Sequence, residues 1–298
     1  MAQNKIVLAK INQEKSQDHS TRVRLFRKLK RALGMPLLAF YTSFRYPVAI
    51  EDSDAEMLES VLQTMDTHRG FALMISSPGG SGLAAERIAN VCRCYSGTGK
   101  YLAIVAGKAK SAATIVCLGA EKILMGPSSE LGTIDPQVVV EEDGKTKWFS
   151  VHNIVRSYEE LFTKAVEEKG NLHPYLQQLE KYDAREIQEM KAALSLTEDM
   201  AVKLLKTGML SELSEDEIRQ KIELLLTPKE LKVHGRPLYA RDAIMCGLTV
   251  QVIDQNSQLW ATLHELHVRL NAFVSSNKVA KCIETEEHSF IAQVGGGR

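Results

Sequence analysis

Three short apolar runs, separated by helix-length segments, constrain the fold of this chain more than any other feature. The runs occupy residues 71–75, 101–106 and 123–125, and they are bounded by glycine, serine or proline. Such short runs are typical of buried strands. Between the first two lies LAAERIANVCRCY, with apolar residues at helical spacing, and between the second and third lies SAATIVCLGA. Alternating strands and helices predict an α/β fold with a parallel sheet.

Two of the predicted strand-to-helix turns carry residues suited to acyl chemistry. Gly79 and Gly80 lie in SSPGGS after the first run, and two bare amides near a helix N-terminus can hold an oxyanion. Ser111 follows the second run, where the positive end of the next helix dipole meets its hydroxyl. Taken alone, the Pro-Gly-Gly segment is explained by a tight turn, and Ser111 is explained by a simple helix N-cap. Their occurrence at successive turns of one sheet favours a functional site.

The ordered motifs of this stretch resemble a known family. The chain contains PGG, AAERIA, GKAKSAAT and GAEKILMGPSSELGTIDPQ in that order, followed by HGRPLYARDAIMCGLTV at residues 234–250. Over about residues 35–254 this set is similar to the serine dehydrogenase proteinase family, within the Clp protease, signal peptide peptidase A and crotonase-like superfamily. The resemblance implies a crotonase-like, Clp protease-type fold of repeated βαβ units in a mostly parallel sheet, with a helical insertion. It also implies a serine endopeptidase, with Ser111 as nucleophile and the Gly79 and Gly80 amides as oxyanion hole.

A serine nucleophile needs a base. In Clp-type proteases a histidine falls in the loop that corresponds to residues 131–136, but here this loop reads LGTIDP and contains Asp135 instead. Asp135 is equally suited to orienting a base and to capping a turn. His234, at the start of the closing motif, is the first candidate base, with Asp135 as its partner. The competing interpretation is a hydrogen-bonded structural histidine.

Other candidate bases stay open. His152 opens a predicted helix and is the second candidate. Lys164 would form a Ser–Lys dyad, although a solvated lysine is the usual state on a helix. Lys110 adjoins Ser111, but neighbouring side chains on such a turn usually diverge. Three further histidines are interpreted as surface or packing residues: His68, His264 and His267.

Composition argues against several other classes. Lys and Arg together number 37, as do Asp and Glu, so no net charge favours nucleic acid or a membrane. No apolar run is long enough for a transmembrane helix, and the first residues lack the apolar core of a signal peptide. The five cysteines, an odd number, indicate reduced thiols and a cytoplasmic location. Cys92 and Cys94 have no second ligand pair with matching spacing, so no metal site is expected. No cofactor is expected either.

The chain is predicted to divide into three parts. Residues 1–34 end in a basic amphipathic helix, for which packing on the protein is favoured over binding to anionic lipid or nucleic acid. Residues 35–256 form the peptidase core, with a hairpin around Asp143 and Gly144 and a helical insertion at 152–227. Residues 257–298 form a helix and a flexible tail. The first insertion helix is expected to turn these residues inward: Ile154, Tyr158, Leu161, Phe162 and Val166.

Three functions remain in competition. The favoured one is a serine endopeptidase acting on peptides or proteins as a homo-oligomer, because the hairpin and the next helix carry more apolar surface than a lone arm should expose. The missing Clp-type histidine instead favours a non-catalytic or weakly catalytic oligomeric scaffold on the same fold. An acyl-CoA-handling crotonase relative would share the oxyanion hole, but it would not require a serine at position 111.

Overall fold

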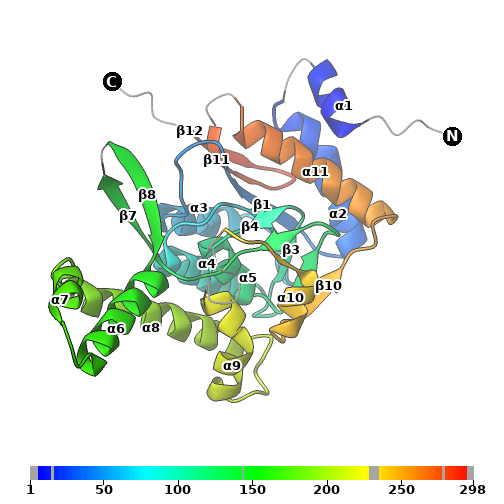
Figure 1. The fold of residues 1–298 in the computed structure, drawn as a ribbon. Coiled ribbons are helices and arrows are strands. Elements are labelled where there is room, and N and C mark those ends of the chain that lie inside the picture. Colours follow the sequence, from blue (N-terminus) through cyan, green and yellow to red (C-terminus); the bar gives the residue numbers. More distant parts are fainter. Residues whose placement is uncertain (1–5, 15–16, 143, 228–234, 277–278, 294–298) are drawn as a thin grey trace.

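A seven-stranded mixed sheet forms the centre of the protein in the computed structural model, which describes residues 6–14, 17–142, 144–227, 235–276 and 279–293 (Figure 1). Counted along the sheet, the first five strands run parallel, the sixth pairs antiparallel with the fifth, and the seventh pairs antiparallel with the sixth. In spatial order the strands are β10 (Val250–Val252), β5 (Lys122–Met125), β3 (Leu102–Val105), β2 (Ala72–Ser76), β1 (Leu37–Thr42), β11 (Val279–Glu284) and β12 (Ser289–Gln293). The predicted α/β fold with a mostly parallel sheet is therefore confirmed.

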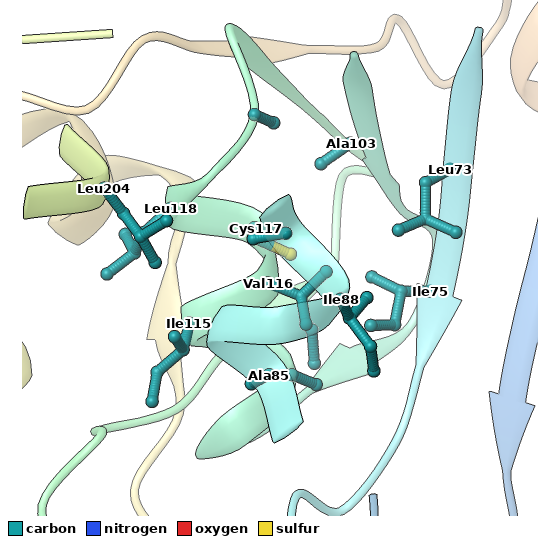
Figure 2. Packing of buried hydrophobic residues seen from close by; sticks show 14 of the residues in the cluster. Leu73, Ile75, Ala85, Ile88, Ala103, Ile115, Val116, Cys117, Leu118 and Leu204 are labelled. Carbon is teal, nitrogen blue, oxygen red and sulfur yellow. The ribbon is translucent and has the colours of Figure 1, made fainter. Parts of the chain in front are cut away.

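Helices cover both faces of this sheet, because successive strand side chains point to opposite sides. On one face lie α2 (Ser20–Leu33) and α11 (Gln258–Val274), packed against Ala39 and Met74. The other face is covered by α3 (Asp52–Leu62), α4 (Gly82–Tyr95) and α5 (Ala112–Leu118). Figure 2 shows this second layer, in which Leu73 and Ile75 of β2 meet Ile88 of α4 and Val116 of α5. The predicted strands and helices of the central stretch are all present.

A small three-stranded sheet lies beside the nucleophile turn. It consists of β4 (Lys108–Ala109), β6 (Glu130–Leu131) and β9 (Leu238–Tyr239), and α10 (Ala240–Met245) follows directly. Because β4 ends two residues before Ser111, this sheet joins the nucleophile turn to the segment that leads towards Asp135.

The segment after Gln137 forms a projecting arm, as Figure 1 shows. The predicted hairpin is present as β7 (Gln137–Glu142) and β8 (Lys145–Ser150). It leads into α6 (Val151–Glu167), α7 (His173–Leu179), α8 (Ala184–Lys206) and α9 (Glu215–Leu226). Ser214 and Glu217 form the predicted capping box of α9.

The predicted inward face of α6 is wrong for Phe162 and Val166, whereas Ile154, Tyr158 and Leu161 are half-buried. Val151 and Val155 are its buried residues, whereas Phe162 and Val166 are 54% and 71% exposed. The helix leaves the core after its first turns, so the apolar face has no described partner within this chain beyond the arm itself.

The N-terminal helix packs on the protein, as predicted. Leu25 and Leu29 of α2 are buried in the hydrophobic cluster that α2 and α11 form with one face of the main sheet. A further short helix, α1 (Val7–Gln13), contacts α11. Among the described residues, no helix combines the length and apolar character needed to cross a membrane.

The C-terminal segment differs from the predicted flexible tail. Residues 279–284 and 289–293 form β11 and β12, and β11 pairs with β1 in the main sheet. The charged residues of β11 are buried with partners: Glu284 lies 2.6 Å from Arg22, and Lys281 lies 2.8 Å from Asp54. These ion pairs offset the free-energy cost of removing the charged side chains from water, so this charged segment can be buried.

Candidate active site

The turn after β2 is fastened to the turn that precedes α5. The backbone N–H of Ser77 donates to the Lys108 carbonyl (3.1 Å), and the N–H of Lys110 donates to the Ser77 carbonyl (3.0 Å). Ser77 and Ala109 form an isolated parallel bridge. These bonds bring the Pro-Gly-Gly turn against Ser111, so the two turns noted in the sequence meet at one place.

Ser111 adopts a backbone conformation that is rare for a residue with a side chain. Its φ is 50° and its ψ is −119°, and among the described residues it is the single non-glycine with positive φ. It stands at the N-cap of α5, yet its side chain forms no capping hydrogen bond. The alternative of a simple side-chain cap is therefore not what the structure shows. Backbone strain of this kind clusters at functional sites, including the strand-to-helix turns that hold nucleophilic serines.

The backbone amides around Ser111 differ in whether they are available to an oxyanion. The N–H of Gly79 donates to the Ser77 hydroxyl at 3.1 Å. The N–H groups of Gly80 and Ala112 form no hydrogen bond with the described residues. Both residues line the same pocket as Ser111. One amide of the predicted pair is thus already engaged.

Ala112 is a residue that the sequence reasoning missed. It is the first residue of α5, where no intrahelical partner exists for its N–H. A signal was present in the sequence, because the residue that directly follows a nucleophile at a helix start always carries such an amide.

Ser111 lies where two pockets adjoin. The larger has a volume of about 560 Å³ and the smaller about 300 Å³, and Phe44 and Trp148 line both. None of the described side chains that line the larger pocket is charged. The larger pocket is lined chiefly by the loop after β1, the glycine turn, the start of α5 and single residues of β8 and α8. The site therefore has room for a chain on both sides of Ser111.

Two of the candidate bases are not brought to these pockets. His152 is the second residue of α6, and its Nδ1 is buried without a hydrogen-bond partner among the described residues. Lys164 is exposed in the last turn of the same helix. Neither residue lines a pocket that contains Ser111.

Lys110 lies near Ser111 but is held by other groups. Its Nζ donates to the Leu131 carbonyl at 3.1 Å and lies 3.0 Å from Glu130 Oε1. Burial lowers the pKa of Lys110 from its ordinary value, and the Glu130 carboxylate opposes that effect. The ammonium group is therefore engaged with the β6 segment.

The structure describes only one of the two residues that are predicted to move the proton, Asp135 and His234. Asp135 is buried, and its neighbours Ile134 and Pro136 line the larger pocket. His234 lies outside the described residues. Gly235, the next residue in the chain, lines the smaller pocket together with Ser111. The roles of His234 and Asp135 stay a prediction.

Thr114 joins the nucleophile helix to the segment before Asp135, and the sequence reasoning did not single it out. Its buried hydroxyl donates to the Ala109 carbonyl (2.8 Å) and accepts the N–H of Gly132 (3.1 Å). A polar residue inside the apolar helix SAATIVCL was the available signal, since a buried hydroxyl needs a partner.

No cluster of three or more His, Cys, Asp or Glu side chains is arranged to hold a metal ion within the part of the chain that the structure describes. The groups that lie together at Ser111 are instead backbone amides and a hydroxyl, which are the groups that acyl-transfer reactions use.

A mostly parallel sheet with a strained serine at a helix start is the arrangement of a ClpP-like α/β protein. The chain belongs to the family described as ClpP-like SDH-type serine proteinase, whose model matches residues 1–251.

Similarity to individual proteins is partial. Two uncharacterized proteins of Methanocaldococcus jannaschii, MJ0137 and MJ1495, are 33% and 32% identical over 105 and 106 residues. These segments are 35% and 36% of this chain, and they span only 33% and 32% of the relatives' own length.

Two solved structures are also similar. A mutant of ClpP1 from Listeria monocytogenes matches with a TM-score of 0.38 and 15% identity, over 78% of this chain and 99% of that one. A mutant of the 1510-N membrane-bound stomatin-specific protease matches with a TM-score of 0.30 and 16% identity, over 43% of this chain and 63% of that one.

Proposed function

We propose that this protein is a serine peptidase in which Ser111 attacks the carbonyl carbon of a peptide bond. The observation that carries the proposal is the strained backbone of Ser111, whose hydroxyl is not used as a helix cap. Membership of a serine proteinase family supports it. Strain is retained at a position only where the surrounding structure enforces it, and such positions concentrate at active sites.

The amides beside Ser111 supply the electrostatic part of the reaction. When the Ser111 oxygen adds to the carbonyl, the N–H groups of Gly80 and Ala112 stabilise the oxyanion that forms. Gly79 shapes the turn, while its own N–H remains hydrogen-bonded to the Ser77 hydroxyl. The base takes the Ser111 proton and passes it to the leaving amine, and water then hydrolyses the acyl-enzyme. We assign the base to His234, oriented by Asp135.

The pocket indicates which peptides fit. Its described lining lacks charged side chains, so a charged substrate residue would lose its hydration without gaining a partner. Substrates whose side chain in this larger pocket is uncharged should therefore be preferred.

Assembly and location are also part of the proposal. The arm exposes Trp148, Phe149 and Phe162, each more than 40% exposed, and a second copy of the chain would cover them. All five cysteines are free thiols, which suits a reducing cytoplasm.

A fluorophosphonate probe tests the nucleophile. The wild-type protein should be labelled and Ser111→Ala should not. Ser43→Ala is the matched control, because Ser43 is a buried serine of the same pocket and its variant should keep the label. Labelling that survives in Ser111→Ala would contradict the assignment.

The same experiment separates the competing functions. An assembled protein that hydrolyses no peptide and takes no label would be a scaffold. Hydrolysis of an acyl-CoA thioester that persists in Ser111→Ala would indicate crotonase-type chemistry.

A further inference from the structure

A second hollow, of about 710 Å³, lies at the amino ends of β1 and β2, whereas Ser111 lies beyond the carboxyl ends of the parallel strands. It is lined by the last turns of α2, the residues just before β1, and residues 66–69, which precede β2. The pocket of Ser111 is instead lined by residues that follow these strands. Strands of this length separate the two edges by about 16 Å at ~3.3 Å per residue. The two sites are therefore distinct.

Basic side chains dominate the lining of this hollow. They are Arg27, Lys30, Arg31 and Arg69, accompanied by His68, against the carboxylates of Asp66 and Glu286. The chain as a whole carries no net charge, so this excess is local.

Part of this charge is left without a counter-ion. Glu286 is already engaged, since Arg27 lies 2.8 Å from its Oε1 and Lys30 lies 4.0 Å from its Oε2. Arg31 and Arg69 form no ion pair with a carboxylate in the described part of the chain. Two exposed guanidinium groups are thus available from two different elements, one on α2 and one on the turn before β2.

A smaller cavity of about 170 Å³ adjoins the basic hollow and shares Lys30, Pro36, Asp66 and Glu286 with it. Apolar groups of Phe26, Leu37 and Met65 line it. Its oxygen-bearing side chains, which can accept hydrogen bonds, are Thr64, Asp66, Thr285, Glu286 and Glu287. This lining suits a compact organic group that carries hydrogen-bond donors, whereas a bare hydrocarbon chain would remove water from the carboxylates without replacing its hydrogen bonds.

We infer that these joined cavities bind a small phosphate ester, with the phosphate on Arg31 and Arg69 and the hydroxyl- or amine-bearing part in the smaller cavity. Guanidinium groups match phosphate oxygens in a bidentate geometry, and two of them neutralise a doubly charged phosphate. Hydroxyl or amino groups of the ester donate to the carboxylates and threonines of the smaller cavity. A nucleotide has this chemistry, and so does the glycerol-phosphate headgroup of an anionic lipid. The inference does not depend on the proposed peptidase activity.

Calorimetric titration of the full chain tests this site with three probes: ADP without divalent metal, inorganic pyrophosphate, and vesicles of phosphatidylcholine containing phosphatidylglycerol. The test variant is Arg31→Glu/Arg69→Glu. The matched control is Arg24→Glu/Lys28→Glu, which reverses two charges of α2 that do not line the hollow. None of the four side chains is buried, so both variants should keep the fold, which circular dichroism checks.

The expected result is ADP binding to the wild type and to the control, and binding at least about tenfold weaker to Arg31→Glu/Arg69→Glu, since charge-assisted hydrogen bonds are lost. Weaker binding of pyrophosphate than of ADP would support a role for the smaller cavity. Binding to vesicles alone, with the same dependence on Arg31 and Arg69, would identify the ester as a lipid headgroup. Failure of every probe to bind at millimolar concentration would overturn the inference, and so would equal losses in the two variants.

Discussion

Gly79 packs directly against Ser111: a β-carbon added to this glycine would lie 2.7 Å from the Ser111 Cβ and 3.0 Å from the Lys110 carbonyl oxygen. Its φ of 115° is also one that side-chain-bearing residues rarely adopt. Gly79 therefore contributes to the site by its small size, in addition to any role of its amide.

Gly79→Ala should remove activity and destabilise the protein. We expect a loss of roughly 2–4 kcal/mol, because backbone strain adds to a contact that the backbone cannot relieve. Denaturant unfolding and peptide hydrolysis measure the two effects. Gly34→Ala is the control, since Gly34 also has positive φ (72°) but a methyl group at that position would meet nothing within 4 Å. Equal losses in both variants would show that the contact with Ser111 has no energetic effect.

Replacement of Ser111 by glycine should separate function from stability. Ser111→Gly and Ser111→Ala should both be inactive, but the glycine variant should be more stable than the alanine variant by about 1 kcal/mol, because glycine accepts positive φ without strain. Urea unfolding of the two variants measures the difference. If the alanine variant is the more stable one, the backbone at position 111 is not strained.

His234→Ala should lower the turnover rate about a hundredfold and change KM little, if His234 is the general base. The neutral imidazole must accept the Ser111 proton, so wild-type activity should rise as pH increases through the pKa of the base, which for an ordinary histidine is about 6.5. His152→Ala should keep both the rate and the pH profile. Near-normal turnover with a lower melting temperature would make His234 a structural residue.

His267 should make stability fall in mild acid. Burial lowers its pKa to about 4, and its Nδ1 lies 2.9 Å from the Tyr41 hydroxyl. Above about pH 6.5 the ring is neutral in both the folded and the unfolded chain, so it has no effect there. As pH falls from about 6.5 towards 4 the unfolded chain binds the proton first, which removes up to roughly 3 kcal/mol of stability.

His267→Gln tests this prediction, because glutamine does not titrate and can still accept the Tyr41 hydrogen bond. The free energy of unfolding of the variant should vary less between about pH 7 and pH 4.5 than that of the wild type. Parallel curves for the two proteins would contradict the lowered pKa.

The exposed arm should set the oligomeric state. We expect light scattering to give a mass larger than one chain, and Phe162→Glu/Val166→Glu to shift the protein towards the monomer, because charge on an apolar interface opposes association. Ile244→Glu/Met245→Glu changes two similarly exposed apolar residues away from the arm and is the control. A wild-type protein that is monomeric at micromolar concentration would contradict this prediction.

The central sheet was predictable because its signals are local. Each of β2, β3 and β5 is an apolar run bounded by turn residues, and the helices between them show a regular apolar face. The meeting of Gly79 and Ser111 followed from topology, since parallel strands place their carboxyl ends at one edge.

The features that the sequence did not reveal depend on partners far along the chain. The strand β11 contains Lys281 and Glu284, which indicate a surface segment until Asp54 and Arg22 are known to meet them. The exposed face of α6 has the same apolar period as a buried helix, so periodicity alone could not distinguish burial within this chain from burial against another. The position of Ala112 directly after Ser111 indicates a free amide, but only the folded turn shows that Ala112 and Gly80 line the same pocket as Ser111.

The pairing of β11 with β1 has a consequence for the order in which the protein is made. Strand β1 is among the first elements to leave the ribosome, and its partner β11 is synthesised about 240 residues later. At a synthesis rate of roughly 5–20 residues per second, one edge of β1 stays uncovered for about 12–48 seconds. An uncovered edge is a template for pairing with other chains. Ribosomes that stall before Val279 should therefore yield aggregation-prone nascent chains, even though every residue around Ser111 has already been made.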